Sequence, residues 1–396
     1  MSMTPIPKGF RFSALASGIK KSGKLDLALI VSDVPAACAG VFTQNRVVAA
    51  PVVISRKNIA DLTCQAILVN SGNANACTGP EGYKIAERTL NLAADALKLE
   101  SDAVAIASTG VIGAQLPLTP FESGIPELVS GLKSDRADDV AEAIRTTDAF
   151  VKISAIAPTD EHDYTLLGLA KGAGMIHPNM ATMLGFVMTD ARVEPNFLNR
   201  ALKDAVQKSF NSITVDRDTS TNDTVLLLAN GCAETALIEE GTKEADAFCR
   251  HLHKVLLDLA KMIVRDGEGA TKLVQIKVTG AVDEQDARTA ACSVATSSLV
   301  KTAFFGEDAN WGRIIAAVGY SGIDVDPDRI DIHFGDVAVT RNGVTTGPEK
   351  EAEATAVLKL DEFVVTIDLN QGEAESSYYT SDLGYEYVKI NADYRT

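Results

Sequence analysis

A single threonine stands between a glycine-rich stretch and a long apolar run in the segment "KGAGMIHPNMATMLGF", which covers residues 171–186. A threonine hydroxyl is a weak nucleophile until a base removes its proton, and spacing along the chain places no histidine or aspartate as a partner for Thr182. Cleavage of the peptide bond before Thr182 would create an α-amino group with a reference pKa of about 7.7–8.0, which can act as that base. The segment therefore fits the chemistry of an N-terminal nucleophile.

The residues upstream of Thr182 suit such a self-cleavage, because the chain must distort there for the hydroxyl to attack its own preceding carbonyl. An alternative is a glycine-rich loop that leads into a buried strand, with the hydroxyl hydrogen-bonded to the backbone. The local sequence favours neither interpretation over the other. The small upstream residues are Gly172, Ala173, Gly174 and Ala181.

Five other stretches combine small and polar residues in the same way. Each one alone is typical of a loop with special backbone geometry, but together they indicate a binding or catalytic surface, because functional groups concentrate on loops held by a rigid scaffold. No G-x-S-x-G elbow, phosphate-binding loop or dinucleotide fingerprint accompanies them. The stretches are "NSGNANACTG", "ASTGVIG", "RTTDAF", "DGEGATK" and "VKINADYRT".

Composition and charge limit the class of protein. A chain of 396 residues is too long for one ordinary core and suits two large lobes. A net charge of −16 argues against nucleic acid as a partner, and a small anionic substrate would need a local cation. The six cysteines form no C-x-x-C pair and are predicted to be reduced thiols.

Neither a membrane nor a metal is predicted. The start of the chain has no signal-peptide core, and no apolar run approaches the roughly 18 residues that span a bilayer, so we expect a cytoplasmic protein without membrane partners. His251 and His253 lie two residues apart, which on a helix points them to different faces. No other spacing indicates a metal site.

The elements that must position these residues are a mixture of strands and helices. Short apolar runs in the first eighty residues, "LDLALIV", "APVVIS" and "CQAILVN", predict strands, and "TMLGFVMTDA" predicts a buried strand after Thr182. Three-four periodicity predicts helices over residues 84–99, from Pro195 to about 210, and over 248–263. Near the C-terminus "RIDIHF", "FVVTIDL" and the Asn342-Gly343 pair predict strands and a hairpin.

The segment around Thr182 resembles the self-processing motif of the ornithine acetyltransferases, also called glutamate N-acetyltransferases, which act in arginine biosynthesis. The likeness covers nearly the whole chain. One departure is Ala173, where many members carry serine, and this change keeps the position small. The other similar blocks, in the family's order, are "VFTQNRVVAAPV", "NSGNANACTG", "STGVIG", "TTD", "NSITVDRDTSTNDT", "DGEGATK", "FFGEDANWGR" and "VKINADYRT".

The resemblance implies that the precursor cleaves itself between Ala181 and Thr182. Residues 1–181 would form an α chain and residues 182–396 a β chain, and the two would stay together, with two αβ pairs in a heterotetramer. The implied fold is mixed α/β (α+β). It is a two-layered αββα sandwich of the ornithine acetyltransferase type, similar to but distinct from that of the N-terminal nucleophile hydrolases.

The implied reaction moves an acetyl group from N2-acetylornithine to glutamate through an ester on Thr182, giving ornithine and N-acetylglutamate. No external cofactor is required, because two acyl-transfer steps share one nucleophile. Acetyl-CoA is a further donor in members that also acetylate glutamate directly, and the motifs do not separate the two kinds of member. Two other interpretations remain: a self-processed amidase or aminopeptidase of the same fold, and a non-catalytic protein that binds an amino-acid-like ligand.

The resemblance also implies roles for individual residues. Thr109 and Gly110 would form the oxyanion hole, where a hydroxyl and a backbone N–H stabilise a tetrahedral intermediate. Acetylornithine carries a carboxylate and a distant ammonium, so its pocket needs groups of both charges. The implied substrate-binding residues are Thr147 or, after a slip of one position, Thr146, together with Lys171, Thr182, Glu268, Asn391 and Thr396.

Overall fold

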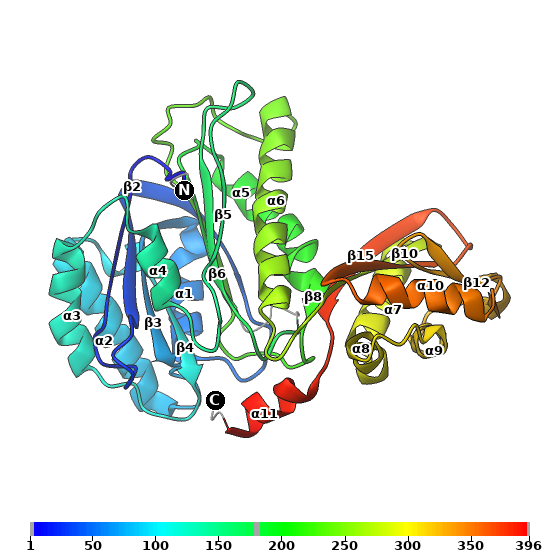
Figure 1. Ribbon diagram of the computed structural model, residues 1–396. Helices are drawn as coiled ribbons and strands as arrows, with labels where there is room; N and C mark the ends of the chain where they lie inside the picture. The colour runs from blue at the N-terminus through cyan, green and yellow to red at the C-terminus, as the bar shows by residue number, and fades with distance from the viewer. Residues whose placement is uncertain (1–3, 178–182, 394–396) are drawn as a thin grey trace.

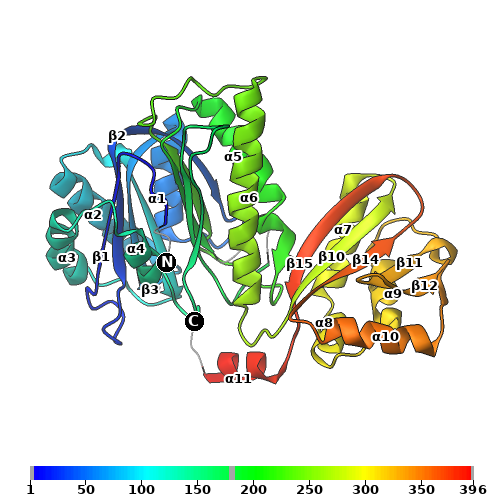
Figure 2. The same ribbon diagram turned by 45° about the horizontal axis from the view of Figure 1, so that its top comes forward.

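The computed structural model describes residues 4–177 and 183–393, and it has two lobes joined side by side (Figure 1). The larger lobe holds most of the chain up to about residue 270, and the smaller lobe is built from the following hundred or so residues. Helix α11 (Tyr385–Asp393) then returns from the smaller lobe to lie beneath the larger one (Figures 1 and 2). The two lobes expected from chain length are therefore present.

The larger lobe has two β layers made from one continuous sheet. Within the described residues this sheet has eight strands in the order β4-β3-β2-β9-β7-β6-β5, with β1 beside β2. Strand β2 (Leu27–Phe42) belongs to both layers, because its first part pairs with β1 and β3 and its last part pairs with β9. The register shifts between Val31 and Ala36, and such an irregularity bends a strand and lets it change layer.

The other strands of this sheet are short and mostly buried. Because successive side chains point to opposite faces, strands covered on both faces appear in sequence as continuous apolar runs. The predicted strands "LDLALIV" and "CQAILVN" are confirmed in β2 and β3, and "TMLGFVMTDA" contains β7. The bounds are β1 (Phe10–Leu15), β3 (Thr63–Asn73), β4 (Val104–Val111), β5 (Lys152–Ile156), β6 (Leu166–Lys171), β7 (Leu184–Thr189) and β9 (Thr224–Ala229).

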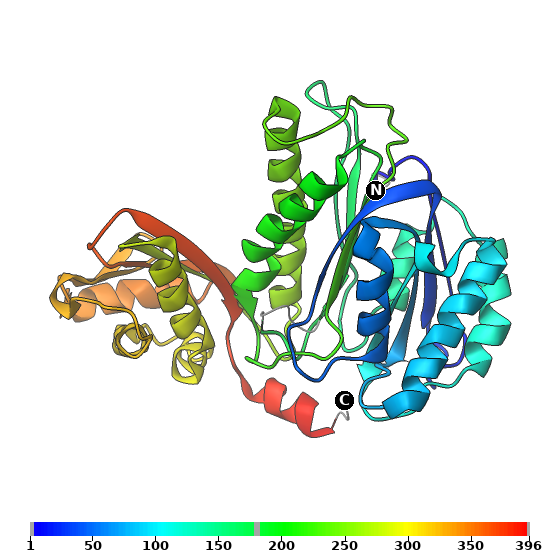
Figure 3. The ribbon, with the colours of Figure 1, turned by 180° about the vertical axis from the view of Figure 1, so that it is seen from behind.

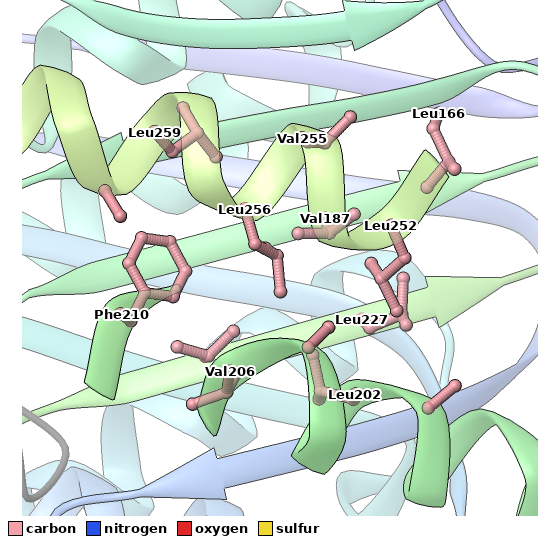
Figure 4. Packing of buried hydrophobic residues seen from close by; sticks show 14 of the residues in the cluster. Leu166, Val187, Leu202, Val206, Phe210, Leu227, Leu252, Val255, Leu256 and Leu259 are labelled. Atoms are coloured by element: carbon pink, nitrogen blue, oxygen red, sulfur yellow. The ribbon is translucent and has the colours of Figure 1, made fainter. Parts of the chain in front are cut away.

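The larger lobe has four layers, helix, sheet, sheet and helix, and one hydrophobic cluster lies between each pair of neighbouring layers. Between the β layers, Ile30 and Ile67 of one layer share a core with Phe186 and Leu226 of the other. Helices α2 (Gly79–Leu97) and α3 (Thr119–Ser130) cover the outer face of the first layer. Helices α5 (Pro195–Gln207) and α6 (Lys243–Arg265) cover the outer face of the second (Figures 3 and 4). The lobe is thus the αββα sandwich expected from the resemblance.

The periodic helices form because each presents one apolar stripe to the sheet. Leu252, Val255, Leu256 and Leu259 of α6 pack on Val187 and its neighbours in the second layer (Figure 4). Helices α5 and α6 are capped by side chains at their N-termini. The Glu194 carboxylate accepts from two backbone N–H groups of α5, and the Thr242 hydroxyl accepts from the backbone N–H of Ala245 in α6. The three helices predicted from periodicity are confirmed as α2, α5 and α6.

The strand predicted at "APVVIS" is wrong, because residues Ala50–Asn58 form helix α1. Pro51 occupies the first turn, where a missing N–H and a fixed φ favour a helix start. The Ser55 hydroxyl donates to the Ile106 carbonyl at 2.6 Å and accepts from the Ile106 N–H at 2.7 Å, which fixes the helix against β4. The consecutive apolar residues Val52, Val53 and Ile54 masked the helical period in the sequence.

The smaller lobe has a second sheet and one core. Within the described residues the strand order is β13-β12-β11-β14-β10-β15-β8. Edge strand β8 (Ile213–Thr214) belongs to the part of the sequence that otherwise forms the larger lobe. It pairs with β15 (Ala374–Ser381) and so joins the two lobes. The remaining strands are β10 (Leu273–Ala281), β11 (Asp331–Phe334), β12 (Val337–Arg341), β13 (Val344–Thr345) and β14 (Glu362–Asp368).

The predicted strands and hairpin of this lobe are confirmed. "RIDIHF" contains β11 and "FVVTIDL" contains most of β14, while Asn342 and Gly343 join β12 to β13 with positive φ angles of 47° and 71°. None of the helices in the described ranges is long and apolar enough to cross a membrane. The helices are α7 (Glu284–Thr296), α8 (Ser298–Phe305), α9 (Trp311–Gly319) and α10 (Pro348–Leu358), and α4 (Ala137–Ala143) belongs to the larger lobe.

Lys301 of α8 is a fully buried cation in the smaller lobe. Its ammonium donates to the Thr380 hydroxyl at 2.7 Å and to the hydroxyl and carbonyl oxygens of Ser381. Burial lowers the pKa of Lys301 to about 7, although the carboxylates of Asp382 and Asp216 favour its charged form. Most of the folded protein therefore holds this lysine neutral above pH 7.

We expect Lys301→Met to change how stability depends on pH. Between about pH 7 and the unfolded pKa of about 10.4, the unfolded chain binds a proton that the folded chain does not, so wild-type stability rises with pH. Relative to the variant, the wild-type free energy of unfolding should gain up to about 1.4 kcal/mol per pH unit in this window. Urea titrations of both proteins at several pH values between 7.5 and 9.5 measure the two free energies of unfolding. If the difference between them did not change with pH, the prediction would be contradicted.

Candidate active site

The residues singled out from the sequence gather around one cavity of about 200 Å³ in the larger lobe. The cavity lies where β3, β4 and β6 end. The segment after α4, the segment between β8 and β9, the turn after α6 and helix α11 contribute the rest of its lining. Seven of the predicted residues line it, although they come from five separate parts of the chain. They are Thr109, Gly110, Thr146, Thr147, Lys171, Glu268 and Asn391.

Thr109 and Gly110 are at the end of β4, next to the end of β3. Gly110 has a φ of 133°, and a Cβ atom there would lie only 2.4 Å from the backbone carbon of Gly72. Only glycine fits this conformation and this approach. The Thr109 side chain is buried, and its hydroxyl accepts from the Lys171 ammonium at 3.4 Å. A hydroxyl and the backbone beside it thus face the same cavity.

Lys171 is the last residue of β6 and is almost completely buried. Burial lowers the pKa of its ammonium below the usual range, while the carboxylates of Asp148 and Glu268 partly counteract this. The nearby Lys152 ammonium lowers it further. A bound carboxylate would favour the charged form, so Lys171 is suited to hold an anionic group of a ligand.

A buried cluster of charges holds the walls of the cavity together. The Lys152 ammonium binds Asp148 at 2.7 Å and also binds Asp266, and both of these ion pairs are almost completely buried. Although burial alone would favour a protonated Asp148, Lys171 and Lys152 hold the pKa of its carboxyl well below the usual range. The same carboxylate accepts from the backbone N–H groups of Thr146 at 2.9 Å and Gly172 at 2.6 Å. Asp148 therefore fixes two segments that line the cavity.

Glu268 is one of three carboxylate residues that line the cavity. Its backbone N–H donates to the Ala173 carbonyl at 3.0 Å, and its carboxylate accepts from the Asn391 side-chain amide at 2.9 Å. A Cβ atom at Gly174 would lie 2.4 Å from this carboxylate, so the glycine-rich stretch leaves room for it. Gly269 likewise lets helix α11 approach, since its Cβ would lie 2.5 Å from the Tyr387 nitrogen.

Three of the predicted residues, Ala181, Thr182 and Thr396, lie outside the described part of the chain. Two aspartates hold the described residues that precede and follow Ala181 and Thr182 in the chain. The carboxylate of Asp216 accepts from the N–H groups of Met175 and Ile176 at 2.6 and 2.7 Å. That of Asp223 accepts from the N–H of Met183 at 3.1 Å.

Several residues of the cavity were not assigned a role from the sequence. Asn222 is buried and its amide donates to the carbonyls of Ala74 and Ser108, which joins it to the ends of β3 and β4. The block "NSITVDRDTSTNDT" was similar to the family's, but its residues carried no spacing that marks a role. Together the unassigned lining residues are Ala74, Ile112, Met175, Asp216, Asp218, Ser220, Thr221, Asn222 and Tyr387.

The fold and the cavity define a class of protein. An αββα sandwich carries a small, partly buried polar cavity, lined by the buried ammonium of Lys171 and by carboxylates that include that of Glu268. Such a site suits a small zwitterionic molecule, and the hydroxyl and glycine at the end of β4 are suited to a reacting carbonyl. The class of protein that such a site fits is an enzyme that works on acylated amino acids.

Comparison with known proteins gives the particular family. The model of the ArgJ family matches residues 11–396, and the chain belongs to this family. It is 62% identical to the arginine biosynthesis bifunctional protein ArgJ of Syntrophotalea carbinolica over 98% of this chain and 99% of the relative. It is 55% identical to the protein of the same name from Geobacter sulfurreducens, over 98% and 99% of the two chains.

A solved structure supports the same assignment. The crystal structure of the arginine biosynthesis bifunctional protein ArgJ from Bacillus halodurans is 44% identical with a TM-score of 0.51. The match covers 53% of this chain and 98% of that one. The resemblance drawn from the motifs is thereby confirmed: the chain is an acyltransferase of arginine biosynthesis.

Proposed function

We propose that the chain transfers the acetyl group of N2-acetylornithine to glutamate, after cleaving itself between Ala181 and Thr182, and that acetyl-CoA is a second acetyl donor. The observation that carries this proposal is the convergence of Thr109, Lys171 and Glu268 on one cavity in a member of the ArgJ family. These residues come from three separate parts of the chain, and only the fold brings them together.

The first half of the reaction forms an ester on Thr182. Its hydroxyl oxygen attacks the acetyl carbonyl while the α-amino group of Thr182 takes the hydroxyl proton. The C–N bond of the amide then breaks, and ornithine leaves with that proton on its amine. In the second half the amine of glutamate attacks the ester and the C–O bond breaks. A proton from the glutamate amine passes to the Thr182 oxygen through the α-amino group.

Each half passes through a tetrahedral oxyanion, for which we propose the Thr109 hydroxyl and the Gly110 N–H as donors. One such donor typically stabilises a transition state by about 2.7–4 kcal/mol. The close contact between the backbones of Gly110 in β4 and Gly72 in β3 supports this assignment, because it fixes the ends of β3 and β4 before substrate binds. Preorganised donors need no rearrangement during the reaction.

The two charged residues would orient the substrate. We assign the substrate carboxylate to Lys171 and the distant ammonium of acetylornithine to Glu268, with Asn391 holding the Glu268 carboxylate in place. Thr146 and Thr147 both line the cavity, and both remain candidates for the substrate-binding threonine. Thr182 and Thr396 complete the proposed set.

The two chains produced by cleavage would stay together through the sheet. Strands β6 and β7 flank the cleavage point and pair along six residues each, and β9 of the second chain pairs with β2 of the first. The relative from Bacillus halodurans is matched along 98% of its chain by 53% of this one, so it is about half as long. Residues 182–396 are likewise slightly more than half of the chain. We further propose that two αβ pairs form the complete molecule.

A coupled assay tests the reaction. The purified protein is given N2-acetylornithine with and without glutamate, and N-acetylglutamate, ornithine and acetate are measured. We expect N-acetylglutamate and ornithine in equal amounts only when glutamate is present, with the parallel double-reciprocal lines of a ping-pong mechanism. Release of acetate at the same rate without glutamate would instead identify an amidase.

Gly174→Ala tests the role of Glu268. The new methyl group would displace the Glu268 carboxylate, whose flexible side chain can move, so we expect a stable protein with a KM for acetylornithine raised about tenfold. The matched control is Gly319→Ala at the end of α9, where no atom lies within 4 Å of the added Cβ. Equal KM values in the two variants would contradict the assignment of Glu268.

A further inference from the structure

A second cavity, of about 400 Å³, lies beside the active-site cavity, and its lining holds four basic residues and two acids, Glu142 and Asp148. Three lysines and an arginine contribute to it in a chain whose net charge is −16. The lysines come from the loop "ASGIKKSGKL" (residues 16–25), which contains no acidic residue. They are Lys20, Lys21 and Lys24, and the arginine is Arg145.

The two cavities share a thin wall. Thr146 lines both of them. At the end of β3, Gly72 lines the basic cavity and Ala74 the active-site cavity. At the end of β4, Val111 lines the basic cavity, while its neighbours Gly110 and Ile112 line the other. The ends of β3 and β4, together with Thr146, therefore lie between a ligand in the basic cavity and the proposed oxyanion hole.

The loop that carries the lysines is held in one conformation. The fully buried carboxylate of Asp26 accepts from the backbone N–H groups of Ser17, Gly18 and Lys20 at 2.6–3.1 Å, and from the Ser17 hydroxyl at 2.8 Å. A carboxylate that binds several backbone N–H groups fixes a loop without help from a ligand. The loop is thus held up to Lys20 before anything binds, and the Gly23 N–H donates to the Lys20 carbonyl at 3.3 Å, which turns the chain between Lys21 and Lys24.

Lys20 joins this loop to the wall of the active site. Its ammonium donates to the carbonyls of Leu25, Ala143 and Arg145 at 2.9, 3.2 and 2.7 Å, and Arg145 directly precedes Thr146. The Lys20 side chain also lies against Gly72, where a Cβ atom would be 3.0 Å from its Cγ. Lys20 is therefore occupied in holding the loop and does not offer a free charge.

Lys21 and Lys24 are the free positive charges of the basic cavity. Both are exposed, and neither forms an ion pair within the described residues. The nearby acids are already engaged: Glu142 binds Arg145, and Asp148 binds Lys152. Two ammonium groups without an ion pair, three residues apart on one loop, attract a ligand with several negative charges, against the field of the rest of the protein.

We propose that the basic cavity binds the phosphate groups of the nucleotide end of acetyl-CoA, with the pantetheine arm passing Thr146 so that the thioester carbonyl reaches Thr109 and Gly110. This inference rests on the proposed use of acetyl-CoA as second donor. In that step the Thr182 oxygen bonds to the acetyl carbon, the C–S bond breaks, and the CoA thiol leaves with the hydroxyl proton. N2-acetylornithine has no phosphate and does not use the basic cavity.

The double variant Lys21→Ala/Lys24→Ala tests this inference with three donors: acetyl-CoA, S-acetylpantetheine and N2-acetylornithine. We expect the KM for acetyl-CoA to rise about tenfold, because two charge-assisted contacts to phosphate are lost. The kinetic constants with S-acetylpantetheine, which lacks the nucleotide, and with N2-acetylornithine should stay within about twofold of wild type. Potassium chloride should raise the wild-type KM for acetyl-CoA more than that for N2-acetylornithine.

The matched control is Lys203→Ala/Lys243→Ala, which removes two exposed lysines that line neither cavity. It should leave the KM for all three donors unchanged. An unaltered KM for acetyl-CoA in the Lys21→Ala/Lys24→Ala variant, or an equal rise with S-acetylpantetheine, would overturn the site. So would a wild type that uses N2-acetylornithine but not acetyl-CoA, whereas failure with every donor would overturn the proposed function itself.

Discussion

Thr182→Ala is expected to remain one chain of 41.9 kDa and to form no N-acetylglutamate from either donor. The variant lacks the hydroxyl that attacks the preceding carbonyl during cleavage and the acetyl carbonyl during transfer. Removing the nucleophile of an acyl-transfer enzyme lowers kcat by about 10⁶-fold in a well-studied protease, and we expect a loss of at least about 10³-fold here. Intact mass, N-terminal sequencing and the coupled assay on the same samples measure both effects.

Thr182→Ser is the control for this prediction, because it retains a hydroxyl at the same atom. We expect slower but complete cleavage, with a second N-terminus that reads Ser-Met-Leu-Gly, and measurable transfer. Wild-type protein should give Thr-Met-Leu-Gly at that terminus. Normal transfer by Thr182→Ala, or an uncut wild-type chain after prolonged incubation, would exclude Thr182 as the nucleophile.

Lys152→Met is expected to have the largest effect on stability. The variant leaves the carboxylates of Asp148 and Asp266 buried without their cation, and breaking a buried ion pair in this way costs about 3–5 kcal/mol. Because Asp148 also fixes Thr146 and Gly172, the remaining folded protein should show a raised KM for acetylornithine. Urea unfolding and steady-state kinetics measure the two effects.

Lys254→Met is the matched control, since Lys254 also pairs with an aspartate four residues away, at 2.8 Å, but at the surface of α6. An exposed pair of this kind contributes less than about 1 kcal/mol. The depressed pKa of Asp148 adds a pH test: its contribution is present above the unfolded pKa of about 3.9 and is lost as pH falls below it. Equal destabilisation by the two substitutions at pH 7 would show that the buried cluster is not a structural anchor.

Periodicity and family-like motifs predicted much of the fold, and the motifs also named residues that the structure brings to one cavity. Thr109, Lys171 and Glu268 belong to three short blocks of 6 to 16 residues, and each lines the same cavity. Helix α6 was predicted because an apolar residue recurs every three or four positions when one face is buried. Helix α1 was mispredicted because its apolar residues are consecutive and carry no such period.

The Lys152 cluster and the basic loop were not predicted, for a different reason. Lys152 is four residues from Asp148 but more than a hundred from Asp266, and nothing near it in the chain marks it as buried. A lysine is exposed by default, so its burial follows only from the packing of β5 against α6 and the turn after it. The same holds for Lys20, whose partners at Ala143 and Arg145 are far along the chain.

The sequence by itself determined the local properties of this protein: where the chain turns, which faces are apolar, and which short blocks resemble those of an acetyltransferase. These depend on residues a few positions apart, and their spacing is visible in the sequence. Only the tertiary structure decided that the blocks meet, because strand β2 crosses between two layers and brings β3, β4, β6 and the turn after α6 to one cavity. Which charges are buried and paired, and which on the neighbouring loop remain free for a ligand, follows from that packing.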